Sequence, residues 1–350
     1  MNICFVLPGF SRTPIGGYKI VYEYANRLEK LGNSVIIVSM NDKKMKQFNL
    51  PESIRITMVN LINKIEPLWF NLDKKIIKIS NLEKNFLDKI KKSDVVFATG
   101  IQTVEFVKNN FDNAKKLYLI QGYENWSTSD AYLQETYSYG FINIVVSNWL
   151  KNIVDQYSKS PSILIKNPID TSIYKSIISQ DKRKEHCIGI LYHTQELKGL
   201  KYAMDALYQL KELYNDLTVE MFGMFQRPKE FPEWIHYTKS ASQNKTVEIY
   251  NKVQIFLCAS IEEGYGLTGL EAMACGACLV STSYNGVYEY AKNNYNSLLS
   301  PVKDVDALVR NVIDLFENPE KRMYLANNGI ESVKELNWDN AIEKIYELIK

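Results

Sequence analysis

The sequence predicts an α/β protein built from two successive domains, each with a parallel sheet between layers of helices. Short apolar runs alternate with helical patterns along nearly the whole chain, which is the rhythm of parallel strands covered on both faces. At 350 residues, 46% of them hydrophobic, the chain is also too long for one ordinary core and has enough apolar residues for two.

The strands fall into two groups. In the first group we expect strands at 3–7, 34–39, 55–60, 95–99, 117–121, 144–147 and 163–166, with helices between them. The pattern restarts with strands at 188–192, 219–222, 255–259 and 279–282. Two sheets in sequence account for this order more simply than one very wide sheet.

The boundary between the domains is predicted at Asn167 and Pro168. Proline cannot continue a helix, and it biases the residue before it toward an extended conformation. We therefore assign residues 1–167 to the first domain, 168–332 to the second, and 333–350 to a terminal helical segment.

Three segments after the boundary have clear local signals. Residues 176–185 are polar and are expected to form a loop, with the basic cluster 182–184 in solvent. Pro319 is expected to open a helix. The last helix, 338–349, is amphipathic, with four apolar residues on one face: Ile342, Ile345, Tyr346 and Ile349.

Residues 73–92 interleave seven lysines with apolar residues, a pattern typical of a basic amphipathic helix. Such a helix either packs its apolar face on the sheet or lies on an anionic lipid surface. Both alternatives stay open here. The second would give the protein a peripheral membrane contact through its first domain.

Composition limits the kinds of binding partner and the cellular compartment that we expect. The net charge of +2 is too small to predict a nucleic-acid partner. Cys275 and Cys278 are separated by two residues, but no second Cys or His cluster follows at zinc spacing, so a metal site is not expected, and a reducing compartment is inferred. The chain begins with a strand, and no apolar run reaches transmembrane length. We therefore expect a cytoplasmic protein, at most peripheral to a membrane.

The most informative pattern is a pair of glutamates, Glu263 and Glu271, placed around a glycine-rich bend directly after an apolar strand. The strand is expected to end near Ser260, and a helix to start near Thr268 with Glu271 in its first turn. Free N–H groups at a helix start suit a diphosphate, and carboxylates suit sugar hydroxyls. The pattern therefore predicts a sugar-handling loop.

The segment 260–276 resembles the E-x7-E signature of retaining GT-B glycosyltransferases of the family four type. The resemblance implies two Rossmann-like domains facing each other across a cleft, the first binding the acceptor and the second the nucleotide sugar. It also implies that the terminal segment 333–350 crosses back to the first domain. It implies that Glu263 meets the transferred sugar and Glu271 the ribose. A helix dipole alone would explain Glu271 but not Glu263. The residues between them are also expected to bind the donor: Gly264, Tyr265, Gly266, Leu267 and Thr268.

Other positions match the family's phosphate-binding elements. Gly16 and Gly17 match its glycine loop, whose backbone approaches the donor diphosphate, although an ordinary tight turn is the alternative. Lys198 is retained from its Gly-Arg-Leu-x-x-x-Lys-Gly element and is expected to neutralise the diphosphate. His193 stands where that element has Arg, which implies a weaker, pH-dependent contact, or no role at all.

Three further polar residues are candidates. Gln121 stands where the family has a sugar-contacting His, and a glutamine can hydrogen-bond a hydroxyl but cannot act as a base. Glu124 is either an acceptor-side base or an exposed loop carboxylate. Glu289 resembles the acid of the family's Gly-Gly-x-x-Glu turn, or is simply an acid at a helix start.

The resemblance implies retaining transfer of a hexose or deoxyhexose from a nucleoside-diphosphate sugar to a saccharide or lipid-linked saccharide. The setting it implies is cell-surface polysaccharide biosynthesis, with no metal or other cofactor. Because Gln121 and His193 depart from the pattern, a non-catalytic GT-B partner or sugar-binding subunit stays open. A sugar-nucleotide epimerase is the other alternative.

Overall fold

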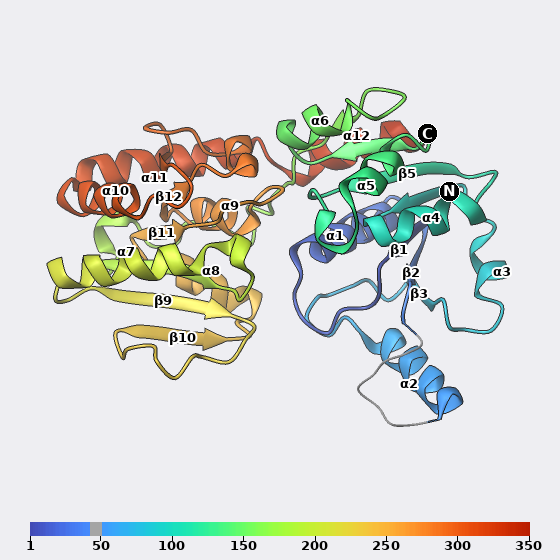
Figure 1. Ribbon diagram of the computed structural model, residues 1–350, viewed down its shortest axis with the longest axis horizontal. Helices are drawn as coiled ribbons and strands as arrows, with labels where there is room; N and C mark the ends of the chain where they lie inside the picture. Colours follow the sequence, from blue (N-terminus) through green and yellow to red (C-terminus); the bar gives the residue numbers. More distant parts are fainter. Residues whose placement is uncertain (43–50) are drawn as a thin grey trace. The chain divides into compact units, whose positions relative to one another are not determined.

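The computed structural model describes residues 1–42 and 51–350, and it contains two compact units (Figure 1). The first unit comprises Met1–Lys166 together with Ile342–Lys350, and the second comprises Asn167–Ala341. The chain therefore passes between units one residue before the predicted boundary. The last nine residues, most of the C-terminal helix α12 (Trp338–Ile349), group with the first unit.

The first unit contains a parallel sheet in the order β3-β2-β1-β4-β5-β6-β7. The chain leaves β1 for β2 on one side, while β4 lies on the other, so the carboxyl ends of β1 and β4 form the topological switch point. The strands are β1 (Asn2–Leu7), β2 (Ser34–Ser39), β3 (Ile77–Ser80), β4 (Val95–Ala98), β5 (Lys115–Ile120), β6 (Ile142–Val145) and β7 (Ile163–Leu164). The helices are α1 (Gly16–Lys30), α2 (Glu52–Ile65), α3 (Phe86–Ile90), α4 (Ile101–Asn110), α5 (Asp130–Tyr137) and α6 (Asn148–Val154).

The second unit repeats this architecture with the order β10-β9-β8-β11-β12-β13, so its switch point lies at the carboxyl ends of β8 and β11. The strands are β8 (Cys187–Tyr192), β9 (Thr218–Gly223), β10 (Ile235–Lys239), β11 (Ile255–Cys258), β12 (Cys278–Thr282) and β13 (Ser297–Ser300). The helices are α7 (Leu200–Leu213), α8 (Gln243–Lys252), α9 (Leu267–Ala274), α10 (Val305–Glu317) and α11 (Pro319–Lys334). Pro319 opens α11, as predicted.

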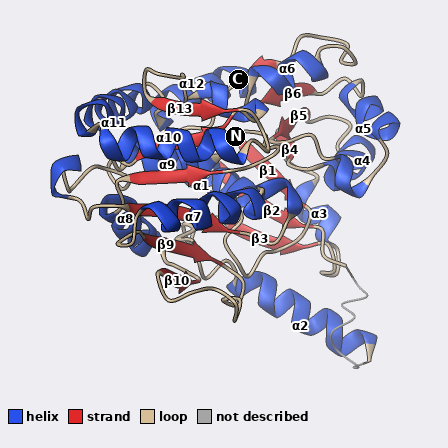
Figure 2. Cartoon of the chain, turned by 60° about the vertical axis from the view of Figure 1, so that its left-hand side comes forward, coloured by secondary structure: helices blue, strands red, loops and turns tan. Residues whose placement is uncertain are grey.

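Helices flank the strands of both sheets (Figure 2). Buried aliphatic and aromatic side chains hold each sheet to its helices. In the first unit Phe5 of β1 stacks on Phe97 of β4, with ring centroids 4.5 Å apart. In the second, Ile190 and Leu257 of the central strands belong to one buried cluster with Leu207 of α7. These apolar strands are buried along their length, so the polar residues that follow them are fixed at the sheet's carboxyl edge.

Two sequence predictions in the first unit are wrong. Residues 55–60 were expected to form a strand, but they lie in helix α2, which buries Val59 and Asn63 at helical spacing. Residues 73–92 were expected to form one amphipathic helix, but they contain strand β3 and the short helix α3. The long amphipathic helix that favoured a membrane contact is therefore absent from this segment.

Within residues 1–42 and 51–350, no helix combines the length and apolar character needed to cross a bilayer.

Arg183 is also placed differently from the prediction, since its side chain is buried, not solvated. Its guanidinium donates hydrogen bonds to the carbonyl oxygens of Tyr250 and Val253 at the end of α8 and of Cys275 at the end of α9. Helix carboxyl ends carry partial negative charge and unpaired carbonyls, which a fork of N–H donors satisfies. These hydrogen bonds attach the segment 176–185 to the carboxyl ends of α8 and α9.

Candidate functional site

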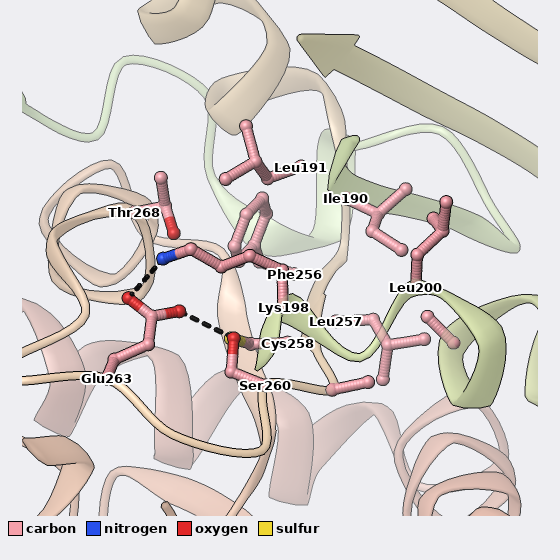
Figure 3. Close-up of a pocket in the computed structure, with 12 residues that line it drawn as sticks. Ile190, Leu191, Lys198, Leu200, Phe256, Leu257, Cys258, Ser260, Glu263 and Thr268 are labelled. Atoms are coloured by element: carbon pink, nitrogen blue, oxygen red, sulfur yellow. Dashed lines mark hydrogen bonds and ion pairs between the residues drawn. The ribbon is translucent and has the colours of Figure 1, made fainter. Parts of the chain in front are cut away.

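A charged pair lies at the switch point of the second unit. Lys198 ends the short 3-10 helix η3 (Glu196–Lys198), which follows β8, and Glu263 lies in the loop that follows β11. The Lys198 Nζ is 3.0 Å from Glu263 Oε2 (Figure 3). The two segments are joined through the backbone as well, because Ile261 N–H donates to Leu197 O at 2.7 Å. The fold therefore fixes a cation and a carboxylate side by side.

The other oxygen of Glu263 is also held. Ser260 Oγ donates to Glu263 Oε1 at 2.5 Å (Figure 3), and Thr282 Oγ1 at the end of β12 donates to Ser260 O. The Glu263 side chain is only 10% exposed, while that of Lys198 is 26% exposed. Burial of a carboxylate is tolerated when it is paired and hydrogen-bonded, as this one is. The orientation of Glu263 is thus determined by two partners before any ligand arrives.

A pocket adjoins this pair, and its two sides differ in chemistry (Figure 3). Its apolar side comes from the strands β8 and β11 and from the start of α7. Its polar side is formed by Lys198, Ser260, Glu263 and Thr268. An apolar wall with a few fixed polar groups occurs in many ligand sites, but this pocket has a volume of only about 20 Å³, which holds no more than a water molecule.

The second glutamate lies on α9. This helix begins at Leu267, one residue earlier than expected, after Gly266 in the left-handed conformation with φ 93°. Glu271 is therefore in the second turn rather than the first. Tyr250 OH donates to Glu271 Oε2 at 3.1 Å from the buried side of α8. The two glutamates are thus placed on opposite sides of one glycine turn, each with a partner from elsewhere in the chain.

Comparison with known proteins shows a family likeness in the second unit. Residues 177–332 match the family model described as glycosyl transferases group 1. Most of the second unit therefore has the sequence pattern of this family. A glycosyltransferase of Methanocaldococcus jannaschii is 24% identical to this chain over 98% of this chain and 97% of its own length.

Other relatives match over shorter stretches. The N,N'-diacetylbacillosaminyl-diphospho-undecaprenol alpha-1,3-N-acetylgalactosaminyltransferase of Campylobacter jejuni is 30% identical over 43% of this chain and 40% of its own. The chain spans 58% of another M. jannaschii glycosyltransferase and 42% of the D-inositol 3-phosphate glycosyltransferase of Corynebacterium urealyticum.

Solved structures show that the fold of this chain is GT-B. Sucrose-phosphate synthase from Thermosynechococcus elongatus matches with a TM-score of 0.76 at 14% identity, over 99% of this chain and 98% of that one. Anabaena HepE, solved in complex with UDP-glucose, matches with a TM-score of 0.75 at 14% identity over the same shares. The predicted fold class, two Rossmann-like α/β domains of GT-B type, is confirmed.

His193, the residue in place of the family's Arg, is half-buried just after β8. Its Nδ1 accepts a hydrogen bond from Gln195 N–H at 3.1 Å, and its ring meets Phe225 edge to face with centroids 5.3 Å apart. Burial, and next the charge of Lys198, lower the pKa of the His193 imidazole, against an opposing effect of Glu263. The ring is therefore neutral at pH 7, with its proton on Nε2.

We expect His193→Arg to increase affinity for a nucleoside diphosphate about fivefold at pH 7.5, because a permanent guanidinium replaces a neutral ring. Isothermal titration with UDP, GDP and dTDP measures this. The control is His193→Gln, which is neutral at every pH and should bind like the unchanged protein at pH 7.5. An Arg variant no tighter than the Gln variant would contradict the placement of His193 against phosphate.

In the first unit, Gln121 and Gly17 are in contact. Gly16 and Gly17 are the first residues of α1, and Gln121 follows β5. Gln121 Nε2 donates to Gly17 O at 3.1 Å, and a Cβ on Gly17 would lie 3.2 Å from the same nitrogen. The amide orientation follows from chemistry, since a carbonyl can only accept. The Gln121 Oε1 atom is consequently the end of the amide that can accept a hydrogen bond from a hydroxyl.

Glu124 is half-buried and not a solvated loop carboxylate. Its Oε2 accepts a hydrogen bond of 2.6 Å from Ile101 N–H, the first amide of α4. A carboxylate at this position caps the free N–H groups of the helix. Burial raises the pKa of the Glu124 carboxyl to about 7, although the Ile101 hydrogen bond opposes it. The side chain therefore changes charge in the neutral range, as a general base requires.

The raised pKa of Glu124 predicts a pH-dependent stability. Between its unfolded value near 4.5 and its folded value of about 7, the folded state binds more protons than the unfolded state, so the free energy of unfolding falls as pH rises. We expect Glu124→Gln to remove this decline while leaving Tm at pH 5 close to that of the unchanged protein. Thermal unfolding from pH 5 to 8 measures it. A wild-type Tm whose slope over this range matches that of the variant would contradict the prediction.

The last candidate, Glu289, ends the 3-10 helix η4 (Asn285–Glu289) and is buried. It is not an acid at the start of a helix, as the alternative interpretation supposed.

The sequence prediction missed the two hydroxyls that hold the glutamates, Ser260 on Glu263 and Tyr250 on Glu271. Ser260 was signalled by its place at the strand end. Tyr250 carried no local signal, because it approaches from a different helix.

Proposed function

We propose that the protein is a retaining glycosyltransferase that moves a hexose or deoxyhexose from a nucleoside-diphosphate sugar to a saccharide or lipid-linked saccharide. The observation that carries the proposal is the Lys198–Glu263 pair at the switch point of the second unit, beside the start of α9 and Glu271. A cation, free helix N–H groups and paired acids are the groups that a diphosphate and sugar hydroxyls require.

The chemistry assigns a role to each group. The acceptor hydroxyl oxygen bonds to the anomeric carbon as the bond from that carbon to the phosphate oxygen breaks, and the acceptor proton passes to the leaving phosphate. Lys198 stabilises the negative charge that develops on the diphosphate. Glu263 accepts from hydroxyls of the transferred sugar, and Glu271 accepts from the ribose. The diphosphate competes with Glu263 for Lys198, so donor binding rearranges the pair.

The setting that we propose is cell-surface polysaccharide biosynthesis in the cytoplasm. Relatives named for such work support it, including O-antigen chain mannosyltransferase B of Escherichia coli, 26% identical over 31% of this chain and 28% of its own. Another relative, from C. jejuni, is named for transfer to a diphospho-undecaprenol saccharide, which supports a lipid-linked acceptor. A peripheral membrane contact stays a prediction.

The test has two stages. Thermal shift with UDP, GDP, dTDP and CDP identifies the nucleotide, because a ligand that binds only the folded state raises Tm. Matched nucleotide sugars are then incubated with saccharide and lipid-linked acceptors, with EDTA present, and released nucleotide and product are measured. We expect nucleotide release coupled to a new glycoside that keeps the donor's anomeric configuration, and none with Glu263→Ala.

Each alternative has its own outcome. A modified sugar that remains attached to the nucleotide would indicate an epimerase. Nucleotide binding without turnover of any donor would favour a non-catalytic partner. Turnover that requires a divalent cation would contradict the assignment of the phosphate charge to Lys198 alone.

A further inference from the structure

Two buried tyrosines lie against the glycine turn that separates the glutamates. Tyr284, 1% exposed, follows β12, and Tyr290, 5% exposed, follows η4. Their hydroxyl oxygens are 2.6 Å apart, and Tyr290 OH donates to Gly266 O at 2.8 Å. Each tyrosine has a single hydroxyl proton. Since that of Tyr290 is committed to Gly266, Tyr284 must donate to Tyr290, and the two hydroxyls form a chain with one direction.

The turn and the hydroxyls are sterically matched. A Cβ added to Gly266 would lie 2.0 Å from the Tyr284 hydroxyl oxygen, and one added to Gly269 would lie 2.6 Å from that of Tyr290. Gly266 also has a φ of 93°, which side chains rarely adopt. The two glycines therefore do more than permit a bend. They admit the tyrosine hydroxyls to the backbone at the start of α9.

The backbone of η4 reinforces the same turn. A Cβ on Gly286 would lie 2.6 Å from Tyr265 N and 2.7 Å from Glu263 O, so the two main chains are in direct contact. The Tyr265 ring lies against that of Tyr290, with centroids 5.6 Å apart. Side chains and backbone of residues 284–290 thus pack against the loop that carries Glu263.

We propose that Tyr284 and Tyr290 are positioning residues for Glu263 and Glu271. They act through the carbonyl of Gly266, which precedes α9. Glu263 lies three residues before this carbonyl and Glu271 five residues after it, so a hydrogen bond at this point fixes the angle between the two carboxylates. The inference rests on the proposed function for its kinetic consequence, while its structural consequence is independent of it.

The kinetic test compares Tyr290→Phe, Tyr284→Phe and the double variant. Loss of the Tyr290 hydroxyl leaves Tyr284 OH without its acceptor and leaves Gly266 O with only the long hydrogen bond from Leu270 N–H at 3.5 Å, so we expect kcat/KM for the donor to fall about tenfold. Loss of Tyr284 removes only the outer link, and about a threefold fall is expected. Because the links are in series, the double variant should be no worse than Tyr290→Phe. If the fall in kcat/KM of the double variant equals the product of the two single falls, the hydroxyls act independently and the proposed series is wrong.

The control away from the site is Tyr214→Phe, which removes a part-exposed hydroxyl that donates to Glu317 at 3.5 Å at the far end of α7. Circular dichroism checks that every variant is folded at the assay temperature. The control should keep its kcat/KM. If it falls as far as Tyr290→Phe, a general loss of stability explains both results and the positioning role is wrong.

Amide hydrogen exchange of residues 263–271 without substrate separates this inference from the proposed function. We expect about tenfold faster exchange in this segment for Tyr290→Phe and no change for Tyr214→Phe. Faster exchange in Tyr290→Phe together with an inactive wild-type protein would support the positioning role and reject the proposed function. Unchanged exchange in Tyr290→Phe rejects the positioning role, whatever the wild-type activity.

Discussion

Replacing Glu263 with glutamine is expected to lower kcat/KM for the donor by about 10²-fold to 10³-fold, the usual cost of losing one fixed electrostatic group in an active site. The substitution keeps the size of the side chain and an oxygen for the Ser260 hydroxyl. It removes the negative charge that lies 3.0 Å from Lys198 and one of the two acceptors available to sugar hydroxyls. Initial rates of nucleotide release over a range of donor concentrations measure the effect.

The neighbouring acid provides the control. Glu262→Gln changes the net charge equally, in the same loop and one residue away, and should retain most of the activity. Since Lys198 and Glu263 act as a unit, a variant lacking both should be little worse than Glu263→Gln. Equal losses in the Glu262 and Glu263 variants would show that loop charge, and not the fixed carboxylate, matters for transfer.

The site could be predicted from the sequence because its parts are local. A buried strand, a glycine bend and a helix follow one another within 255–274, and the polar residues between them must lie at the carboxyl edge of the sheet. The supporting contacts were beyond reach. Tyr250 is 21 residues from Glu271, and Arg183 binds carbonyls 67 to 92 residues away. The periodicity of a sequence cannot reveal contacts between residues so far apart along the chain.

The strands that were missed share a position. In the described part of the chain, the strands without a prediction are β3, β10 and β13, and each lies at the edge of its sheet. An edge strand needs no continuous apolar run, because it has one neighbour and is partly exposed. Ile77 in β3 is 50% exposed, for example. Hydrophobicity revealed the central strands, which are buried on both faces, and one edge strand, β7.

The helix at 55–60 was missed for the opposite reason. Its β-branched residues, such as Ile56, Thr57 and Val59, favour a strand when taken one by one. Tertiary packing decided otherwise, since the pair that α2 buries, Val59 and Asn63, is spaced by one helical turn. Local preference is a weak guide where a short apolar run fits both periods.

The largest effect on stability is expected at Gly199, which joins η3 to α7 with φ 64°. A Cβ at this position would lie 1.8 Å from Ala259 O and 2.7 Å from Ala259 C. No rotation of a side chain relieves this contact, because both partners are backbone. Left-handed alanine costs about 1 kcal/mol, and the displaced strand end adds more, so we expect Gly199→Ala to lose about 3 kcal/mol or more.

A matched glycine separates strain from collision. Gly32 has φ 85° and nothing within 4 Å of its added Cβ, so Gly32→Ala should cost only about 1 kcal/mol. Urea unfolding of both variants measures the difference, and equal losses would mean that β11 yields easily. If β11 resists, Gly199→Ala should also weaken nucleotide binding below its unfolding temperature. Gly199 follows Lys198, and Ala259 precedes the serine that holds Glu263, so a shift between them separates the charged pair.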